Sequence, residues 1–293
     1  MLIILVRKIL NNKWMVLSLL IGSILTVAMV SSVPIYTNGV LQRMLIRDLE
    51  RYQENYGGFT GRFSIRSKLH YYSNDKNERI KAYKWFDDRI TVFPDELDVP
   101  VIVQNKSLIA DNLLAIPEIQ REEKPKTRFF KFKGVTDFEK HAEIIHGRMY
   151  STEIDDDTVE AVITDKTFDA LDLRLDEVYF VQDFLKEDQV LCKVKIVGIF
   201  TIKDPSDLYW FDGLWDYDES FVIDHSLFND FFIENSKEDE GAYLTEVHWN
   251  YALDYHKIKI EHIDRMLSIY EDQTRWVKKY TAILDSKLPL IPI

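Results

Sequence analysis

Residues Trp14 to Val33, WMVLSLLIGSILTVAMVSSV, form a run of twenty uncharged residues near the start of a 293-residue chain. At about 1.5 Å of rise per residue, a helix of this length crosses the roughly 30 Å hydrocarbon layer of a bilayer. The sequence therefore predicts one transmembrane helix close to the N-terminus.

The charges on either side of this run predict its orientation. Arg7, Lys8 and Lys13 precede it with no acidic residue among them, whereas the first cations after it, Arg43 and Arg47, are soon followed by acids. Cytoplasmic flanks of membrane helices carry the excess of positive charge. We therefore expect the N-terminus in the cytoplasm and the bulk of the chain outside the cell membrane.

A cleaved secretory signal peptide is the alternative interpretation, because it also combines a basic start with an apolar run. Its apolar part normally spans about 7–15 residues and ends at a small-x-small cleavage sequence. The run here is longer, and Val30 to Pro34 is a poor cleavage sequence, so a retained helix is favoured. Upstream of it, Met1 to Leu10 is apolar except for Arg7 and Lys8, and we expect it to lie along the inner leaflet.

Composition sets the character of the outer part. The chain is 46% hydrophobic and 29% charged with a net charge of −12, and its first 33 residues contribute only cations. Such acidity argues against nucleic acid and anionic lipid head groups as partners. Cys192 is the single cysteine, which excludes an internal disulfide, and its apolar neighbours predict an inert core side chain. We expect two domains: 1–36, a cytoplasmic segment with the transmembrane helix, and 37–293, an extracytoplasmic domain.

The helix is expected to continue beyond the bilayer, because apolar residues recur at helical spacing from Leu41 to Tyr52. Pro34 and Gly39 predict a bend or break near its start. The pair Gly57-Gly58 predicts its end.

Strands and helices then follow without strict βαβ alternation, which favours an α+β fold. Strands are expected at about 59–65, 99–103, 108–116, 129–132, 160–163, 178–181, 190–200, 221–223 and 243–251, the last of them half-buried. Helices are expected at about 75–90, 137–141, 165–171, 225–232 and 260–280, with caps at Asn74 or Asp75, Asp165 and Asp224. A turn is expected near Asn105 and another at 187–188, and 121–126 reads as a charged link.

Few residues suggest catalysis or metal binding. No HExxH, GxSxG or glycine-rich phosphate loop is present. His141 and His146 lie five residues apart and form only a weak candidate metal pair. Glu153 and Asp155 to Asp157 are acidic but lack the central glycine of an EF-hand, so we interpret them as a solvated loop rather than a calcium site. We therefore expect a non-catalytic protein without a cofactor.

Five aromatic residues crowd an Asp-rich segment that has no periodicity. They are Tyr209, Trp210, Phe211, Trp215 and Tyr217. Because aromatic side chains dominate burial energetics, we expect most of them to anchor the segment to the sheet. Contact with a partner or ligand is the alternative, since exposed aromatic patches mark interaction sites.

Four short motifs follow the expected membrane helix in a fixed order. They are Gly147-Arg148-Met149-Tyr150, Glu160-Ala161-Val162-Ile163, Val197-Gly198-Ile199-Phe200 and Asp204-Pro205-Ser206-Asp207-Leu208-Tyr209-Trp210. In this order and spacing the chain resembles the N-terminal half of an FtsX-like (MacB-type) ABC transporter permease. The resemblance covers essentially the whole chain and is clearest over 145–210.

The chain departs from the family pattern in two respects. Permeases of this type usually have Leu-Gly and then Gly-Asp before the next strand, where this chain has Leu171-Asp172 and Asp176-Glu177. They also carry three further membrane helices after the outer domain, whereas Leu288 to Ile293 is too short to span. The resemblance therefore implies an N-terminal fragment or a split half of a permease.

The resemblance implies a membrane subunit whose outer domain moves when a separate ATPase binds and hydrolyses ATP. Its implied partners are the ABC ATPase, further permease helices and the lipid bilayer, in an oligomeric complex. A helix returning near Ile260 is expected to help couple membrane motion to the outer domain. A single-pass anchored sensor or ligand-binding module is the alternative, and a membrane-anchored hydrolase ranks third because no nucleophile–base pair is recognisable.

Overall fold

The chain divides into two units in a computed structural model that describes residues 13–119, 128–155, 157–183, 190–234, 244–280 and 284–287. Unit 1 comprises Met1–Gly58 and Ile258–Arg265, and unit 2 comprises Phe59–Lys257 and Met266–Ile293. The segments expected along the inner leaflet, at the charged link and at the turn 187–188 lie outside the described residues.

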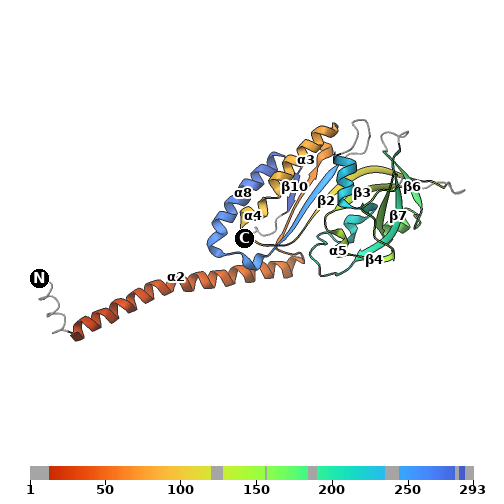
Figure 1. The fold of residues 1–293 in the computed structure, drawn as a ribbon. Helices are drawn as coiled ribbons and strands as arrows, with labels where there is room; N and C mark the ends of the chain where they lie inside the picture. The colour runs from red at the N-terminus through yellow and green to blue at the C-terminus, as the bar shows by residue number, and fades with distance from the viewer. Residues whose placement is uncertain are drawn as a thin grey trace. The chain divides into compact units, whose positions relative to one another are not determined.

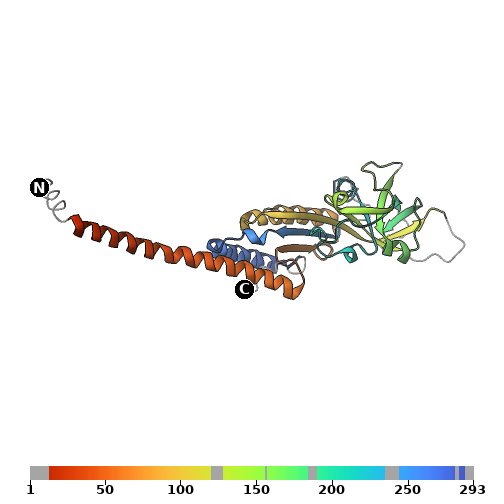
Figure 2. The same ribbon diagram turned by 90° about the horizontal axis from the view of Figure 1, so that it is seen from below.

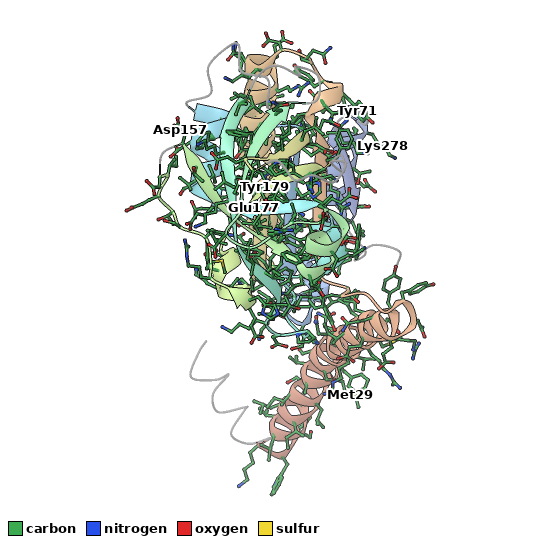
Figure 3. All side chains as sticks on the ribbon, turned by 90° about the vertical axis from the view of Figure 1, so that its right-hand side faces the viewer. Met29, Tyr71, Asp157, Glu177, Tyr179 and Lys278 are labelled. Atoms are coloured by element: carbon green, nitrogen blue, oxygen red, sulfur yellow. The ribbon has the colours of Figure 1, made fainter. Side chains whose placement is uncertain are left out.

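Unit 1 is built on one long helix, α2 (Lys13–Tyr56), which Figure 1 shows in red to orange. By length and composition it is the one helix among the described residues that could cross a membrane. The large apolar side chains of its first part, such as Met29 in Figure 3, are exposed. A helix satisfies its own backbone hydrogen bonds, so apolar side chains on all sides suit a hydrocarbon surrounding.

The end of α2 follows the expectation from sequence, and its middle does not. Gly57 has a φ of 69°, and its N–H donates to the Gln53 carbonyl oxygen at 2.9 Å, which is a glycine C-cap. Of the bend or break expected near Pro34 and Gly39, the break does not occur, because the helix continues through both. Proline removes a single backbone donor, and the remaining hydrogen bonds of a 44-residue helix keep it continuous.

Unit 2 is a mixed sheet with short and long helices packed against it. Its strands are β1 (Arg62–Lys68), β2 (Val101–Pro117), β3 (Phe129–Val135), β4 (Ala142–Gly147), β5 (Thr158–Thr164), β6 (Val178–Asp183), β7 (Val190–Ile202), β8 (Ser220–Ile223), β9 (Glu246–Leu253) and β10 (Leu284–Lys287). Its helices are α3 (Lys76–Ile90), α4 (Phe93–Leu97), α5 (Phe138–His141), α6 (Asp165–Ala170), α7 (His225–Asn229) and α8 (Ile263–Lys279), which begins in unit 1. The expected α+β class, a long apolar helix followed by a mixed sheet domain, is confirmed.

Six strands of this sheet form a closed ring. The strands are hydrogen-bonded in the order β10-β1-β9-β2-β3-β8-β5-β7-β4. Strand β6 pairs with both β2 and β7, so that β2, β3, β8, β5, β7 and β6 form the ring. Strands β3 and β8 run parallel, as do β5 and β7, and the other pairs are antiparallel. In the ring, Phe132 lies opposite Phe221 and Tyr179 opposite Val194, all four fully buried. Closure removes exposed strand edges at this end of the unit.

Strand β2 belongs to both the ring and the open sheet. Its first part pairs with β9 and its last part, Leu113 to Pro117, pairs with β6. Between them the register against β3 shifts, and Asn112 takes a φ of 62°. Bulges of this kind bend a strand and increase its twist. The turn expected near Asn105 is wrong, because a buried side-chain hydrogen bond to Asn250 satisfies this residue inside the strand.

Within unit 2, helix α3 and the main part of α8 pack against each other. Trp85 of α3 contacts Trp276 of α8, with ring centroids 5.5 Å apart. Figure 2 shows α3 running alongside the strands, and Asp87 on this helix accepts a hydrogen bond from the Trp249 indole of β9 at 2.6 Å. Strand β9 is therefore buried along nearly its whole length rather than half-buried as expected. It is an inner strand, between β1 and β2, and it is covered by a helix.

Local capping explains where three helices begin. Asp75 accepts from the Glu78 N–H and begins α3, and Asp224 accepts from the N–H groups of Ser226 and Leu227 and begins α7. Both caps confirm the expectation from sequence. The cap expected at Asp165 is wrong by one residue, because Thr164 accepts from the Thr167 N–H and begins α6.

Candidate functional site

The long helix of unit 1 is tied to the segment that follows β9. The Gln42 amide of α2 donates to the Ile258 carbonyl oxygen at 2.6 Å, and its side-chain oxygen accepts from the Ile260 N–H at 2.8 Å. One side chain thus supplies the donor and the acceptor that a neighbouring strand would supply. We call this pair of hydrogen bonds the Gln42 clamp. The clamp is not predictable from the sequence, because a lone glutamine on an amphipathic helix gives no signal.

The clamp sits at a junction of the chain. At Ile258 the chain passes from unit 2 into unit 1, and α8 begins shortly afterwards at Ile263. A half-buried amide whose two hydrogen bonds go to backbone groups constrains the segment more than an apolar contact does, because hydrogen bonds are directional. The two hydrogen bonds therefore fix the start of the returning segment to α2 within unit 1.

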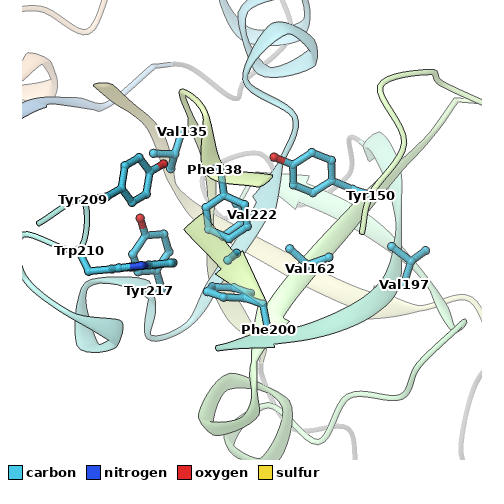
Figure 4. Close-up of a cluster of buried hydrophobic side chains, with 11 residues drawn as sticks. Val135, Phe138, Tyr150, Val162, Val197, Phe200, Tyr209, Trp210, Tyr217 and Val222 are labelled. Carbon is cyan, nitrogen blue, oxygen red and sulfur yellow. The ribbon is translucent and has the colours of Figure 1, made fainter. Parts of the chain in front are cut away.

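In unit 2, the aromatic segment packs over one face of the sheet. Tyr209, Trp210 and Tyr217 are buried together with Phe138 and Phe200, as Figure 4 shows. The ring centroids of Trp210 and Tyr217 lie 5.4 Å apart and those of Phe138 and Phe200 lie 4.9 Å apart. The expected anchoring role is confirmed for these aromatic residues of the segment. Trp215, in contrast, is 62% exposed.

Charged groups also fix this segment to the sheet. Asp212 accepts a hydrogen bond from Arg62 of β1 at 2.8 Å and contacts Arg66 of the same strand. The Lys133 ammonium group of β3 contacts the Asp216 carboxylate, and only 2% of its side chain is exposed. Buried charges require such partners, because water no longer solvates them.

A chain of neutral polar groups runs between these charged pairs. The Ser64 hydroxyl donates to Asn250 at 2.7 Å, Asn250 donates to Asn105 at 2.9 Å, and Asn105 donates to the Tyr209 carbonyl oxygen at 2.9 Å. These side chains come from β1, β9, β2 and the aromatic segment. The Asn105 amide nitrogen therefore finds its partner only when the segment lies on the sheet, whereas both hydrogen bonds of Asn250 lie within the sheet.

His248 of β9 lies within the same polar layer. It is 6% exposed and contacts Glu246 at 3.4 Å. Burial lowers the pKa of His248, and the positive charges of Lys133 and Arg66 lower it further, against the opposing effects of Glu246 and Asp216. The imidazole is therefore held neutral inside the folded unit.

A cavity of about 340 Å³ opens on the other side of β2 and β9. Trp249 and Tyr251 of β9 and Lys106 of β2 line its inner part. Its rim includes the exposed residues Gln104 and Asp137. No sequence pattern indicates this cavity, because its walls come from separate parts of the chain.

The two histidines of the weak metal pair have different surroundings. His141 contacts the Asp207 carboxylate through Nδ1 at 2.6 Å and stacks on Tyr209 with ring centroids 3.8 Å apart, whereas His146 is exposed on β4. In the acidic run, Asp155 accepts from the Thr158 N–H through its backbone at 2.8 Å. The described part of the chain contains no group of three or more His, Cys, Asp or Glu residues suited to a metal ion.

Cys192 is buried in the strand ring, opposite Val181. Burial raises the pKa of its thiol to about 12, so the reactive thiolate is scarce at neutral pH. The interpretation of Cys192 as an inert core side chain is confirmed.

The turn between α6 and β6 has an unusual backbone. Asp172 has a φ of 51° and Asp176 a φ of 62°, both in the left-handed region that favours glycine. The buried Tyr179 hydroxyl pins this turn, because it accepts from the Arg174 N–H at 3.1 Å and donates to the Glu177 carboxylate (Figure 3). Two aspartates in this conformation indicate that the turn geometry is fixed by its surroundings.

Comparisons with known proteins show a distant structural similarity and no family. No protein-family model matches the chain, and no curated relative matches it. A solved domain provisionally described as part of a permease protein from Porphyromonas gingivalis is similar over 64% of this chain and 76% of that domain, with 12% identity and a TM-score of 0.31. A likeness this distant carries no argument about function.

Proposed function

We propose that this chain is the N-terminal portion of an FtsX-like (MacB-type) ABC transporter permease. Helix α2 would span the membrane with its N-terminus in the cytoplasm, and unit 2 would lie outside. The chain would hydrolyse no ATP itself, and a separate ABC ATPase would drive motion of the outer unit through α2, within a complex that contains further permease helices.

One observation carries this proposal beyond the sequence motifs. The family pattern places glycines where this chain has Asp172 and Asp176, and both aspartates adopt the positive φ that glycine accepts most readily. The two departures from the family pattern therefore fall at residues that keep the backbone conformation glycine would take.

The Gln42 clamp supports the mechanical part of the proposal. A stiff helix is able to transmit displacement only if its outer end is attached to something. Gln42 lies nine residues beyond Val33, the last residue of the apolar run, and holds the Ile258–Ile260 backbone by two directional hydrogen bonds. The segment it holds leads directly into α8.

Topology is the first test, and the single buried cysteine simplifies it. In a Cys192→Ser background, Asn77→Cys would place a thiol at an exposed position of α3. Lys13→Cys would place a thiol at the start of α2. In intact cells, a membrane-impermeant maleimide is expected to label the Asn77 variant and to label the Lys13 variant only after lysis. Labelling of Lys13→Cys in intact cells would contradict the orientation.

Partner identity separates the permease from the anchored sensor. The tagged chain, purified in mild detergent from its native membrane, is expected to retain an ABC ATPase that mass spectrometry identifies. ATPase activity in that complex should change when the chain carries Gln42→Leu and stay unchanged with the exposed control Met44→Leu. Purification without any ATPase, but with a kinase or methyl-accepting partner, would favour the sensor.

A further inference from the structure

The cavity beside β2 lies where the sheet loses a strand. Strand β3 pairs with β2 from Ser107 onward and ends at Val135, so the earlier residues of β2 have β9 on one side only among the described residues. Gln104 is exposed there, and Ile102 is 54% exposed. An open strand edge of this kind presents backbone donors and acceptors to a further strand.

The direction of the free backbone groups follows from Lys106. Its N–H donates to the Thr136 hydroxyl at 3.0 Å, and its carbonyl oxygen accepts from the Thr136 N–H at 3.1 Å, both on the side away from β9. Backbone groups of residues two apart point to the same side of a strand. Gln104 therefore directs its N–H and its carbonyl oxygen outward, at the mouth of the cavity.

The positive charge inside the cavity is already neutralised. The Lys106 ammonium group lies 3.1 and 3.2 Å from the two Asp87 carboxylate oxygens and 3.2 Å from the Tyr83 hydroxyl, which uses its three protons. Burial alone would lower the pKa of Lys106, but Tyr83 and Asp87 outweigh that effect and raise it. The lysine is a fixed wall of the cavity and offers no free donor to an anion.

An exposed acidic residue lies at the mouth. Asp137 lines the cavity, and one of its carboxylate oxygens contacts Lys140 in an ion pair whose side chains are 71% and 53% exposed and which solvent therefore screens. Burial raises the pKa of Tyr251, and the negative charges of Asp87 and Asp95 raise it further, so this hydroxyl stays protonated at neutral pH. A cation entering the cavity would meet a carboxylate, a hydroxyl and two aromatic rings.

We propose that this edge binds an extended polypeptide, which pairs with β2 at Gln104 and inserts a lysine or arginine side chain into the cavity beside Asp137. Backbone pairing would supply affinity, and the cavity would supply preference for a basic residue. The outward backbone groups of Gln104 specify a polypeptide rather than a free amine. This inference does not depend on the permease assignment.

The test uses the full chain in detergent and the fluorescein-labelled, end-capped peptide Thr-Val-Lys-Val-Thr, followed by fluorescence anisotropy. We expect saturable binding of the lysine peptide. Replacing its lysine by glutamate should weaken binding about tenfold, which corresponds to about 1.4 kcal/mol. N-methylation of the lysine and both valines should abolish binding, because it removes the backbone donors to β2 whichever direction the peptide runs. Failure of the lysine peptide to bind, or equal binding of the glutamate or N-methylated peptides, would overturn the proposal.

A matched pair of protein variants places the site. Asp137→Asn removes the charge and keeps a residue that tolerates the φ of 58° found there. It is expected to weaken the lysine peptide about fivefold and to leave the glutamate peptide unaffected or slightly improved. Asp88→Asn removes an equally exposed acid from α3 and should change neither. Equal effects of the two variants would show that the peptide responds to overall charge, against a site at the cavity.

Discussion

The Lys133 ammonium group donates to the Asp216 carbonyl oxygen at 2.9 Å and also contacts the Asp216 carboxylate, with only 2% of the lysine side chain exposed. The ring of Tyr217 lies 4.2 Å from the same nitrogen. Burial lowers the pKa of Lys133. Burial alone would raise the pKa of Asp216, but the charge and hydrogen bond of Lys133, with the nearby Arg66, hold it below its usual range. The pair therefore fixes the aromatic segment to β3. Burying either charge costs free energy, and attraction to the charge of the other residue offsets that cost.

Asp216→Asn should be strongly destabilising, because it leaves the buried Lys133 charge without a counter-ion. We expect a loss of about 3–5 kcal/mol in the free energy of unfolding, measured by urea unfolding of the full chain in detergent with tryptophan fluorescence. Lys133→Met should cost less, since the Asp216 side chain is 20% exposed and keeps some hydration. The double variant should lose less than the sum of the two single ones.

The exposed pair Arg275 and Asp272 provides the control for this cycle. Their side chains are 76% and 63% exposed and lie 3.1 Å apart on α8. Asp272→Asn should change the unfolding free energy by less than about 0.5 kcal/mol. A similar loss from both Asp→Asn changes would mean that burial of Lys133 plays no special part.

How much of this fold the sequence predicts depends on how local each cause is. The caps at Asp75 and Asp224, and the end of α2 at Gly57, depend on neighbours within four residues and follow from the sequence. The ion pair between Arg62 and Asp212 joins residues 150 apart, and no periodicity announces it. Closure of the ring by β6 is equally non-local, since it requires Leu113 to meet Asp183.

The candidate site divides in the same way. Crowding of aromatic residues at 209–217 identified the segment, because large apolar side chains need a surface on which to pack. Its polar attachment was invisible, because Asn105 in a strand reads as a turn residue until Asn250 is known to lie beside it. The Gln42 clamp was missed for the related reason that its partners are backbone groups, which carry no sequence identity.

Acid should weaken unit 2 through His248. Burial holds the pKa of its imidazole below the usual value of about 6.5, so below that pH the unfolded chain binds a proton that the folded chain does not. Stability is therefore present above about pH 6.5 and falls as the pH drops towards the folded-state pKa. His248→Gln should reduce the loss of urea midpoint between pH 7.5 and pH 5.5.

Other groups in unit 2 with lowered pKa values also affect how its stability depends on pH. Burial also lowers the pKa of His225, so the His248 variant should remove part of the acid sensitivity and the double variant more. The carboxyl pKa values of Glu246 and Asp216 are lowered too, but these groups titrate at more acidic pH. His256→Gln, at a site 52% exposed, serves as the control. An unchanged pH dependence in the His248 variant would show that its imidazole is not the sensor.

The turn at Asp176 offers a test of backbone strain. Asp176 has a φ of 62°, and its side chain is 77% exposed, with Lys195 at 3.1 Å. Asp176→Gly should raise stability by about 0.5 kcal/mol by relieving the left-handed conformation, and Asp176→Ala should lower it by about 1 kcal/mol. Asp165→Gly, within helix α6, should instead destabilise. If Asp176→Gly and Asp176→Ala changed the stability equally, the change would come from loss of the ion pair with Lys195 rather than from backbone strain.

The Gln42 clamp predicts a local change that leaves the rest of the chain intact. Gln42→Leu keeps a similar volume but removes the donor to Ile258 and the acceptor for Ile260. The Ile260 N–H should then exchange with solvent deuterium about tenfold faster or more, since one lost hydrogen bond is worth about 1 kcal/mol and an unsatisfied group adds to that. Amides in the ring, such as that of Val194, should keep their protection.

Gln42→Glu separates the two hydrogen bonds of the clamp. A carboxylate still accepts from the Ile260 N–H but cannot donate to the Ile258 carbonyl oxygen, and it faces that oxygen with like polarity. Exchange of the Ile260 amide should therefore rank wild type slowest, Gln42→Glu intermediate and Gln42→Leu fastest. Met44→Leu, on the exposed side of α2, should match wild type. If Ile260 exchanged equally in all four proteins, the segment would be held by something other than the Gln42 side chain, and α2 would lose its proposed grip on the chain that leads into α8.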